Sequence, residues 1–289
     1  MILVTGSTGQ FGNAAIDFLS KKMPVNHIAA LARDENKAAV LKAKGIDVRI
    51  GDYTDYNSLV SAFNGVDKLL LVSSSDMQDR GTHHIAAIDA AKEAGVKHIV
   101  YTSACMKDMH NSAISFISES HARTVKHIKN SGLTYTLLNN NLYADVLPMF
   151  IGEKVLETGI FYPAGNGRVP FATRMDMAEA AANILTSEGH ENQEYPISSN
   201  TSDSLSDIAE ILSDLSGKTV FYTSPSKEVY VEQVVKAGVP ETYAGFFAAF
   251  AEAIKQNEFD IPDPTLERLL GRKPTSLKEY LQSFYFTNN

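Results

Sequence analysis

The feature that most constrains the fold is a glycine-rich turn directly behind the first apolar run of the chain. Residues 1–5 read MILVT, and Gly6, Gly9 and Gly12 follow within VTGSTGQFG. Between a strand and a helix, the first glycine permits a tight turn, the second lets the backbone approach a pyrophosphate, and the third lets the helix pack closely. The helix N-terminus then offers free N–H groups and a favourable dipole to an anion. The turn therefore predicts a dinucleotide-binding site, and the alternative is a turn with a purely structural role. The expected contacts to the dinucleotide are Gly6, Thr8, Gly9, Gln10, Phe11 and Gly12.

The first half of the chain repeats a unit of strand, helix and glycine. Short runs rich in Val, Ile and Leu, without clean alternation, are typical of strands buried on both faces of a parallel sheet. We expect strands at 1–5, 27–32, 47–50, 68–73, 98–103 and 134–138, and helices at 14–22, 58–64, 84–94 and 118–130. Glycine at the left-handed cap ends the helical stretches at Gly45, Gly65, Gly95 and Gly132. Repeated βαβ units predict an α/β fold with a Rossmann-type, doubly wound parallel sheet.

After about residue 145 the pattern loosens. We expect an NAD(P)-binding Rossmann domain at 1–145 and a smaller, mostly helical substrate lobe at 146–289, with the chain returning to the sheet around 172–200. The elements expected there are helices at 176–185 and 204–216, strands at 194–197 and 220–222, and largely helical structure at 227–258. Ser276 and Glu279 have the spacing of a capping box that opens a final helix.

Composition limits the classes of partner. The 289-residue chain has a net charge of −8, whereas nucleic-acid and membrane-surface proteins need a basic footprint. No apolar run reaches the roughly 20 residues of a membrane span, and MILVTG is interpreted as a strand rather than a signal peptide. The single Cys105 cannot form an internal disulfide, which indicates a reducing cytoplasm or indifference to redox, and we expect a cytoplasmic protein. With one cysteine, no HExxH pattern and adjacent His83 and His84 pointing apart, no metal site is expected.

The end of the second strand bears on cofactor choice. Arg33 stands twenty-one residues after Gly12, where an acidic residue would bind the ribose 2′-hydroxyl of NAD and an arginine accommodates the 2′-phosphate of NADP. Lys37 lies one helical turn further on and is a second candidate cation. The adjacent Asp34 is the alternative, serving NAD or capping the next helix. We expect NADP to be preferred over NAD.

Small polar residues follow the other strands. Asp52 and Tyr53 come after the third strand, where a carboxylate and an aromatic ring can flank an adenine. Hydroxyl residues follow the fourth and fifth strands, at the edge where open α/β sheets bind ligands. These candidate cofactor contacts are Ser73, Ser74, Ser75, Thr102 and Ser103.

Several segments together carry a resemblance to a known family. They are VTGSTGQFG, GDYTD at 51–55, KLLLVSSS at 68–75, AAKEAGVKHIVYTS at 90–103, SGLTYTLLNNNLYAD at 131–145 and ATRMDMAEAAANIL at 172–185. Nearly the whole chain resembles the NmrA-like branch of the atypical short-chain dehydrogenase/reductases. Within that branch it is similar to the NADPH-dependent quinone oxidoreductase and triphenylmethane reductase subgroup. The resemblance implies NADPH as cofactor.

The chain departs from the larger superfamily at its catalytic motif. Where a Tyr-x-x-x-Lys helix would follow the fifth strand, this chain has His121 at the tyrosine place and Val125 four residues on. Asn139 stands where the subgroup often has an arginine. Asn140 and Tyr143 match the family's N-x-x-Y, so our catalytic candidates are His121, Asn140 and Tyr143. For His121 the alternative is a partly buried or interface histidine without a catalytic role.

These observations predict an oxidoreductase that transfers hydride from NADPH to a quinone or a similar conjugated electrophile. The alternative is an NADP-binding redox sensor or regulator of NmrA type without efficient catalysis. A nucleotide-sugar epimerase or dehydratase is disfavoured because the proton-relay tyrosine is missing. We expect the protein to bind a small-molecule electrophile and to bind neither nucleic acid nor a membrane. The oligomeric state that we consider is a homodimer.

Overall fold

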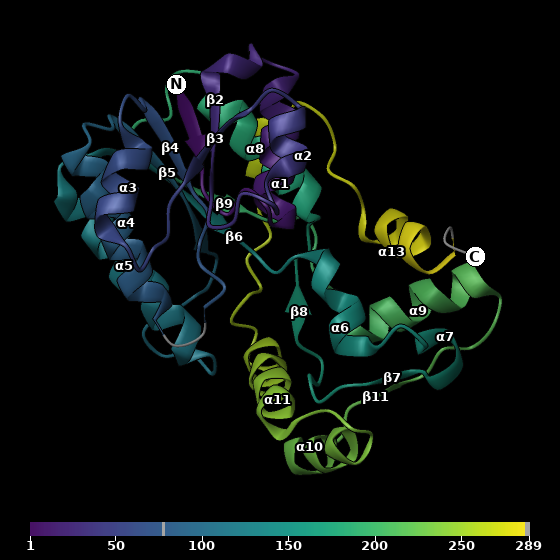
Figure 1. Ribbon diagram of the computed structural model, residues 1–289. Coiled ribbons are helices and arrows are strands. Elements are labelled where there is room, and N and C mark those ends of the chain that lie inside the picture. The colour runs from purple at the N-terminus through teal and green to yellow at the C-terminus, as the bar shows by residue number, and fades with distance from the viewer. Residues whose placement is uncertain (77–78, 287–289) are drawn as a thin grey trace.

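The centre of the molecule is a seven-stranded parallel sheet, in a computed structural model that describes residues 1–76 and 79–286 (Figure 1). The strand order is β3-β2-β1-β4-β5-β6-β9, so the direction of winding reverses between β1 and β4. Open α/β sheets bind ligands at such a switch point, outside the carboxyl ends of the strands. The strands are β1 (Ile2–Val4), β2 (Ile28–Ala32), β3 (Asp47–Ile50), β4 (Lys68–Leu71), β5 (His98–Ala104), β6 (Thr134–Asn140) and β9 (Gln193–Ile197). The predicted doubly wound Rossmann-type fold is confirmed.

Helices cover both faces of this sheet, because its strands are apolar on both sides. One apolar core joins the sheet to α1 (Gln10–Ser20), α8 (Arg174–Leu185) and α12 (Thr265–Leu270). The other joins it to α3 (Tyr56–Phe63), α4 (Arg80–Glu93) and α5 (Ser115–Ser131). Figure 1 shows α1 and α8 on one side of the sheet and α3, α4 and α5 on the other. The short α2 (Ala39–Ala43) and a 3₁₀ turn at Val25–His27 complete this part.

A separate apolar core, which includes Phe150, Tyr162 and Ile254, holds a second group of elements together beyond the carboxyl edge of the sheet (Figure 1). Its helices are α6 (Leu147–Ile151), α7 (Val155–Thr158), α9 (Leu205–Ser216), α10 (Lys227–Lys236), α11 (Glu241–Lys255) and α13 (Leu277–Phe286). Its strands are β7 (Ile160–Phe161), β8 (Arg168–Val169), β10 (Asp203–Ser204) and β11 (Tyr222–Thr223), and a 3₁₀ turn at Ala144–Val146 leads into it.

Local sequence signals located most elements to within a few residues. The four cap glycines have φ between 72° and 83°, the left-handed region in which glycine meets no Cβ penalty. Two to six residues carry too little periodicity, so the following elements were not predicted: helices α2, α6, α7 and α12 and strands β7, β8 and β10. Strand β11 begins two residues later than expected, at Tyr222. No helix in the described ranges is both long and apolar enough to cross a membrane.

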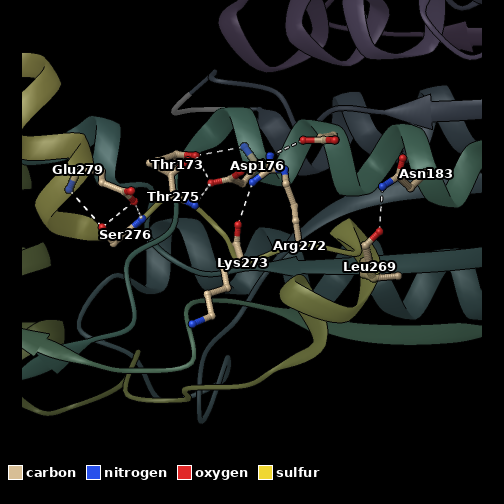
Figure 2. Close-up of polar contacts among 10 residues, drawn as sticks. Thr173, Asp176, Asn183, Leu269, Arg272, Lys273, Thr275, Ser276 and Glu279 are labelled. Atoms are coloured by element: carbon tan, nitrogen blue, oxygen red, sulfur yellow. Dashed lines mark hydrogen bonds and ion pairs between the residues drawn. The ribbon is translucent and has the colours of Figure 1, made fainter.

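A buried carboxylate fastens the C-terminal segment to α8 (Figure 2). Asp176 is only 1% exposed and accepts hydrogen bonds from the Thr173 hydroxyl, the Thr275 backbone N–H and the Arg272 guanidinium, all at 2.7–2.8 Å. Just beyond, the Ser276 N–H donates to Glu279 and the Glu279 N–H donates to the Ser276 hydroxyl, which confirms the predicted capping box. The chain therefore passes from α12 beside the sheet to α13 in the lobe along a fixed path.

Candidate functional site

A cleft of about 800 Å³ opens at the switch point of the sheet. Its walls are the glycine turn and the tips of β2, β3 and β4, so residues distant in sequence meet there. The lining residues are Gly6, Thr8, Gly9, Gln10, Phe11, Gly12, Leu31, Ala32, Arg33, Gly51, Asp52, Tyr53, Thr54, Val72, Ser73, Ser74, Ser75, Asp76 and His83. The structure thus brings together all six residues predicted from the glycine turn.

The three glycines of the turn are needed for different physical reasons. Gly6 has φ +57°, a conformation that side chains disfavour. A Cβ on Gly12 would lie 2.3 Å from the Gly6 carbonyl oxygen, so only glycine lets α1 begin this close to the turn. A Cβ on Gly9 would meet only that same oxygen, at 3.2 Å. Because Gly9 is also exposed, the protein itself does not fill the space above it.

The N-terminus of α1 suits an anion. Its N-cap is Gly9, no side chain accepts a hydrogen bond from its first N–H groups, and its first turn holds no acidic residue. The Ser7 hydroxyl donates to the Leu31 carbonyl at 2.7 Å and ties the turn to β2. Exposed, uncapped N–H groups at a positive helix end are a common phosphate site. The turn therefore fits the pyrophosphate of a dinucleotide.

At the tip of β2, Arg33 lines the cleft, whereas Asp34 forms a hydrogen bond within the following turn. Arg33 is exposed and lines the cleft. The Asp34 carboxylate accepts from the Asn36 N–H at 2.8 Å and so holds the local turn, whereas the N-cap of α2 is Ala38 and the alternative that Asp34 caps this helix is wrong. Lys37 is exposed but is not among the cleft residues. The arrangement thus favours a phosphate beside Arg33 and leaves the role of Lys37 a prediction.

The tip of β3 forms the wall beside Arg33. Asp52 accepts from the Thr54 N–H and hydroxyl, both at 2.8 Å, and its backbone hydrogen bond from Thr54 leads the causes that lower its pKa. Burial raises the pKa of Tyr53 to about 12, so its hydroxyl stays protonated. The Tyr53 ring stacks near the His83 ring, with centroids 6.0 Å apart. These two rings offer a flat surface to a base.

The serines after β4 line the cleft, whereas Thr102 and Ser103 lie behind it. Thr102 is 2% exposed, and its hydroxyl accepts from the Ser73 N–H at 2.8 Å. Ser103 is 4% exposed, and its hydroxyl has no hydrogen-bond partner within the described structure. Thr102 therefore supports the loop after β4 rather than lining the cleft. Cys105 is buried too, and burial raises the pKa of its thiol to about 11, as expected of an inert cysteine.

The proposed catalytic residues lie deeper than the cleft. Asn140 Nδ2 donates to the Tyr143 hydroxyl at 3.2 Å, and the Tyr143 ring lies 6.4 Å from that of Phe11 in the glycine turn. Burial raises the pKa of Tyr143. The N-x-x-Y pair is therefore intact and adjoins the inner end of the turn. Phe150 lies in the apolar core of the lobe.

His121 is a buried, neutral imidazole in this structure. Burial, and next the positive charge of Arg80, hold its pKa well below the usual range. The Arg80 guanidinium can only donate, so the His121 Nε2 accepts at 3.2 Å and the Nδ1–H donates to the Tyr101 hydroxyl at 2.8 Å. This is not the arrangement of a strong acid, and a catalytic role for His121 stays a prediction.

His84 joins this buried network to the cleft. The Ser74 N–H donates to His84 Nε2 at 2.8 Å, so His84 Nδ1 carries the proton and lies 2.9 Å from the Thr124 hydroxyl. Burial lowers the pKa of His84 to about 3. Sequence reasoning considered His83 and His84 only as metal ligands. The described part of the chain holds no group of three metal-binding side chains.

The His84 environment predicts a pH-dependent stability. Because its pKa is near 6.5 when unfolded and about 3 when folded, the stabilising contribution is complete above pH 6.5 and is lost as pH falls towards 3. Between pH 6.5 and 5, the unfolding free energy of the wild type should fall by roughly 1 kcal/mol per pH unit more than that of His84→Gln. Urea titrations across this window measure both, and parallel pH profiles would show that His84 is not the group responsible.

Sequence reasoning missed some cleft residues. His83, Thr54, Gly51 and Asp76 all line the cleft. His83 had no sequence signal, because it precedes the helix expected at 84–94, whereas in the structure α4 begins at Arg80 and includes it. Its position beside Tyr53 depends on how α4 packs against the tip of β3.

The parallel sheet, its switch point and the uncapped glycine turn define a dinucleotide-binding protein of the Rossmann type. The chain belongs to the NmrA-like family, whose model matches residues 1–283. Over 291 aligned residues it is 38% identical to quinone oxidoreductase 2 of Escherichia coli strain K12, with 100% of both chains covered. The family resemblance inferred from the sequence is confirmed.

Two solved structures show the same architecture. The NADPH-dependent quinone oxidoreductase of Escherichia coli, complexed with NADPH, has a TM-score of 0.93 and 36% identity, covering 99% of this chain and 100% of that one. The triphenylmethane reductase of Citrobacter sp., complexed with NADP(H), has a TM-score of 0.92 and 39% identity, covering 98% and 100%.

Proposed function

We propose that this protein is an NADPH-dependent reductase that transfers hydride to a quinone or a similar conjugated electrophile. The observation that carries the proposal is the cleft itself, in which an uncapped glycine turn and Arg33 lie on either side of one space. The full-length similarity to a quinone oxidoreductase, and to structures complexed with NADPH or NADP(H), supports both the cofactor and the reaction class.

Each part of the cleft would have a distinct role in cofactor binding. The N–H groups at the start of α1 would bind the pyrophosphate, and Arg33 the 2′-phosphate. Tyr53 and His83 would contact the adenine, and Asn140 with Tyr143 would position the nicotinamide end. We also assign Ser73–Ser75 to the cofactor, Thr102 to support of their loop, and the region after residue 145 to the substrate side.

The chemistry needs little acid catalysis from the protein. The bound cofactor supplies the hydride, and the chain supplies orientation, exclusion of water and electrostatics. A quinone that accepts hydride becomes a phenolate whose basicity resembles that of tyrosine, so solvent can protonate it. The neutral, buried His121 is compatible with this route and incompatible with a Tyr-x-x-x-Lys type of relay.

An acceptor panel tests the proposal. Purified protein with NADPH should oxidise the cofactor, followed by its absorbance, when a neutral quinone is added, and NADH should support a slower rate. Dinucleotide binding without acceptor-dependent oxidation by any quinone or dye would instead favour the sensor or regulator, the second candidate. The specific observation in favour of that candidate is that the residue at the tyrosine place is neutral and buried.

The assembly and location follow as further proposals. We infer a small-molecule electrophile as substrate, the cytoplasm as location, and a homodimer as the assembly to be checked by light scattering. The acidic net charge of −8 supports the absence of a nucleic-acid partner.

A further inference from the structure

Arg80 is a buried cation with no counter-ion in the described structure. It is the first residue of α4, it is 9% exposed, and it forms no ion pair with any described carboxylate. Its hydrogen bond to the neutral His121 leaves its own Nε without an acceptor. Buried charges are ordinarily paired, because desolvating a lone charge is costly. Arg80 therefore stands out among the cations of this protein.

Two further features make the position of Arg80 electrostatically unfavourable for the protein alone. It lies at the N-terminus of a fourteen-residue helix, where the dipole is positive and a cation is disfavoured. Burial lowers its pKa, yet an arginine stays charged at physiological pH. Asp79 is the N-cap of this helix and its N–H donates to the Asp76 carboxylate, so the unpaired guanidinium rather than the helix end is the feature that favours an anion.

The neighbours of Arg80 connect it to the candidate catalytic residues. His121, which accepts a hydrogen bond from Arg80, stands at the place of the superfamily's catalytic tyrosine and also donates to the Tyr101 hydroxyl of β5. Three more buried polar atoms without partners come from the carboxyl ends of β5 and β6 and from α5: Ser103 Oγ, Asn140 Oδ1 and Ser118 Oγ. Buried polar atoms are usually hydrogen-bonded, so such a group marks a place where a polar ligand would complete the contacts.

We propose that Arg80 stabilises the negative charge that develops on the acceptor oxygen, an inference that rests on the proposed function. In the hydride transfer, a C–H bond of the dihydronicotinamide would break. The hydrogen would move together with the bonding electron pair and form a new bond to the quinone. The nicotinamide is oxidised, the quinone becomes the hydroquinone monoanion, and a solvent proton then completes the hydroquinone. Arg80 faces the oxygen that carries the negative charge.

This role has a consequence for substrate choice. A neutral quinone gains negative charge in the transition state, so a preorganised cation lowers its barrier. A cationic triphenylmethane dye only loses its positive charge, so the same cation repels it in the ground state. The chain should therefore prefer quinones to cationic dyes, and Arg80 should be the residue that sets this preference.

Opposite effects on two acceptors test the proposal. In Arg80→Met, kcat/KM for a neutral benzoquinone should fall by about 100-fold, mainly in kcat, because the charge exists only in the transition state. With malachite green as the cationic dye, kcat/KM should stay unchanged or rise, and Arg80→Lys should recover part of the quinone rate. Equal losses for both acceptors, or a loss confined to KM, would overturn the assignment. Arg123→Met, an exposed arginine of α5 near the start of α4, is the matched control and should change neither acceptor.

A binding measurement separates this inference from the reductase proposal. The free protein is titrated with 4-nitrophenol, whose coloured anion reports ionisation. The wild type should lower the apparent pKa of the bound phenol by about one unit, as a nearby cation does, and Arg80→Met should abolish that shift. An unchanged nitrophenol titration with the wild type would contradict the role of Arg80 even if quinone reduction were observed. A shift without turnover of any acceptor would support Arg80 as an oxyanion site and count against the reductase.

Discussion

Replacement of Gly9 by leucine is expected to weaken NADPH binding by at least about 100-fold while the protein stays folded. Two charge-assisted hydrogen bonds from backbone N–H groups to a phosphate together contribute about 3–6 kcal/mol, which corresponds to that factor or more. The leucine side chain would occupy the space above the turn that the phosphate needs. A Cβ at Gly9 would meet only the Gly6 carbonyl oxygen, at 3.2 Å, so we expect the turn to adjust by a few tenths of an ångström and the fold to be kept.

The same argument does not hold for the neighbouring glycine. At Gly12 a Cβ would lie 2.3 Å from the Gly6 carbonyl oxygen, so a substitution there disturbs the fold as well as binding. Gly9 is therefore the position at which ligand contact and folding can be separated.

Fluorescence titration with NADPH measures the loss, and thermal unfolding checks the fold. Gly245→Leu is the matched control, since Gly245 is exposed in α11 and nothing lies within 4 Å of its Cβ position. That variant should bind NADPH as the wild type does. Wild-type affinity in Gly9→Leu would refute the pyrophosphate assignment.

The second large effect is expected at the tip of β2. Arg33→Asp should change the ratio of NADPH to NADH affinity by about 1000-fold in favour of NADH. The change removes a charge-assisted contact to the 2′-phosphate and adds a repelling carboxylate, and each contributes about 2 kcal/mol. An aspartate there also accepts from the ribose 2′-hydroxyl of NADH, as acidic residues at this place do.

Two further variants divide the effect into its parts. Arg33→Met removes the cation without adding repulsion, and we expect about half of the free-energy change. Lys37→Asp makes the same change of charge at the second candidate cation, and we expect a smaller change in the ratio, because Lys37 is not among the cleft residues and exposed charges are screened. If Arg33→Asp weakened NADPH and NADH equally, Arg33 would not recognise the 2′-phosphate.

Much of the binding half of the site was predictable from local sequence. The glycine spacing, the βαβ repeat and Arg33 at a strand end each act over a few residues, and parallel strands necessarily bring their carboxyl ends to one edge. The catalytic half was less predictable. The sequence indicated His121 from its place in the helix, but neither its burial nor its contact with Arg80 follows from that place.

The amino-acid sequence by itself determined the Rossmann sheet, the phosphate-binding turn and the family, because these depend on short-range patterns of glycine and apolar residues. Tertiary structure alone decided which polar residues are exposed to the cleft and which are buried behind it. Thr102 and Ser103 are buried within β5, where the Thr102 hydroxyl accepts from the Ser73 N–H and the Ser103 hydroxyl has no partner among the described residues. Packing of α4 against α5 likewise placed Arg80 beside a neutral histidine instead of a carboxylate. The burial of a charge depends on neighbours from distant segments, and no local pattern encodes them.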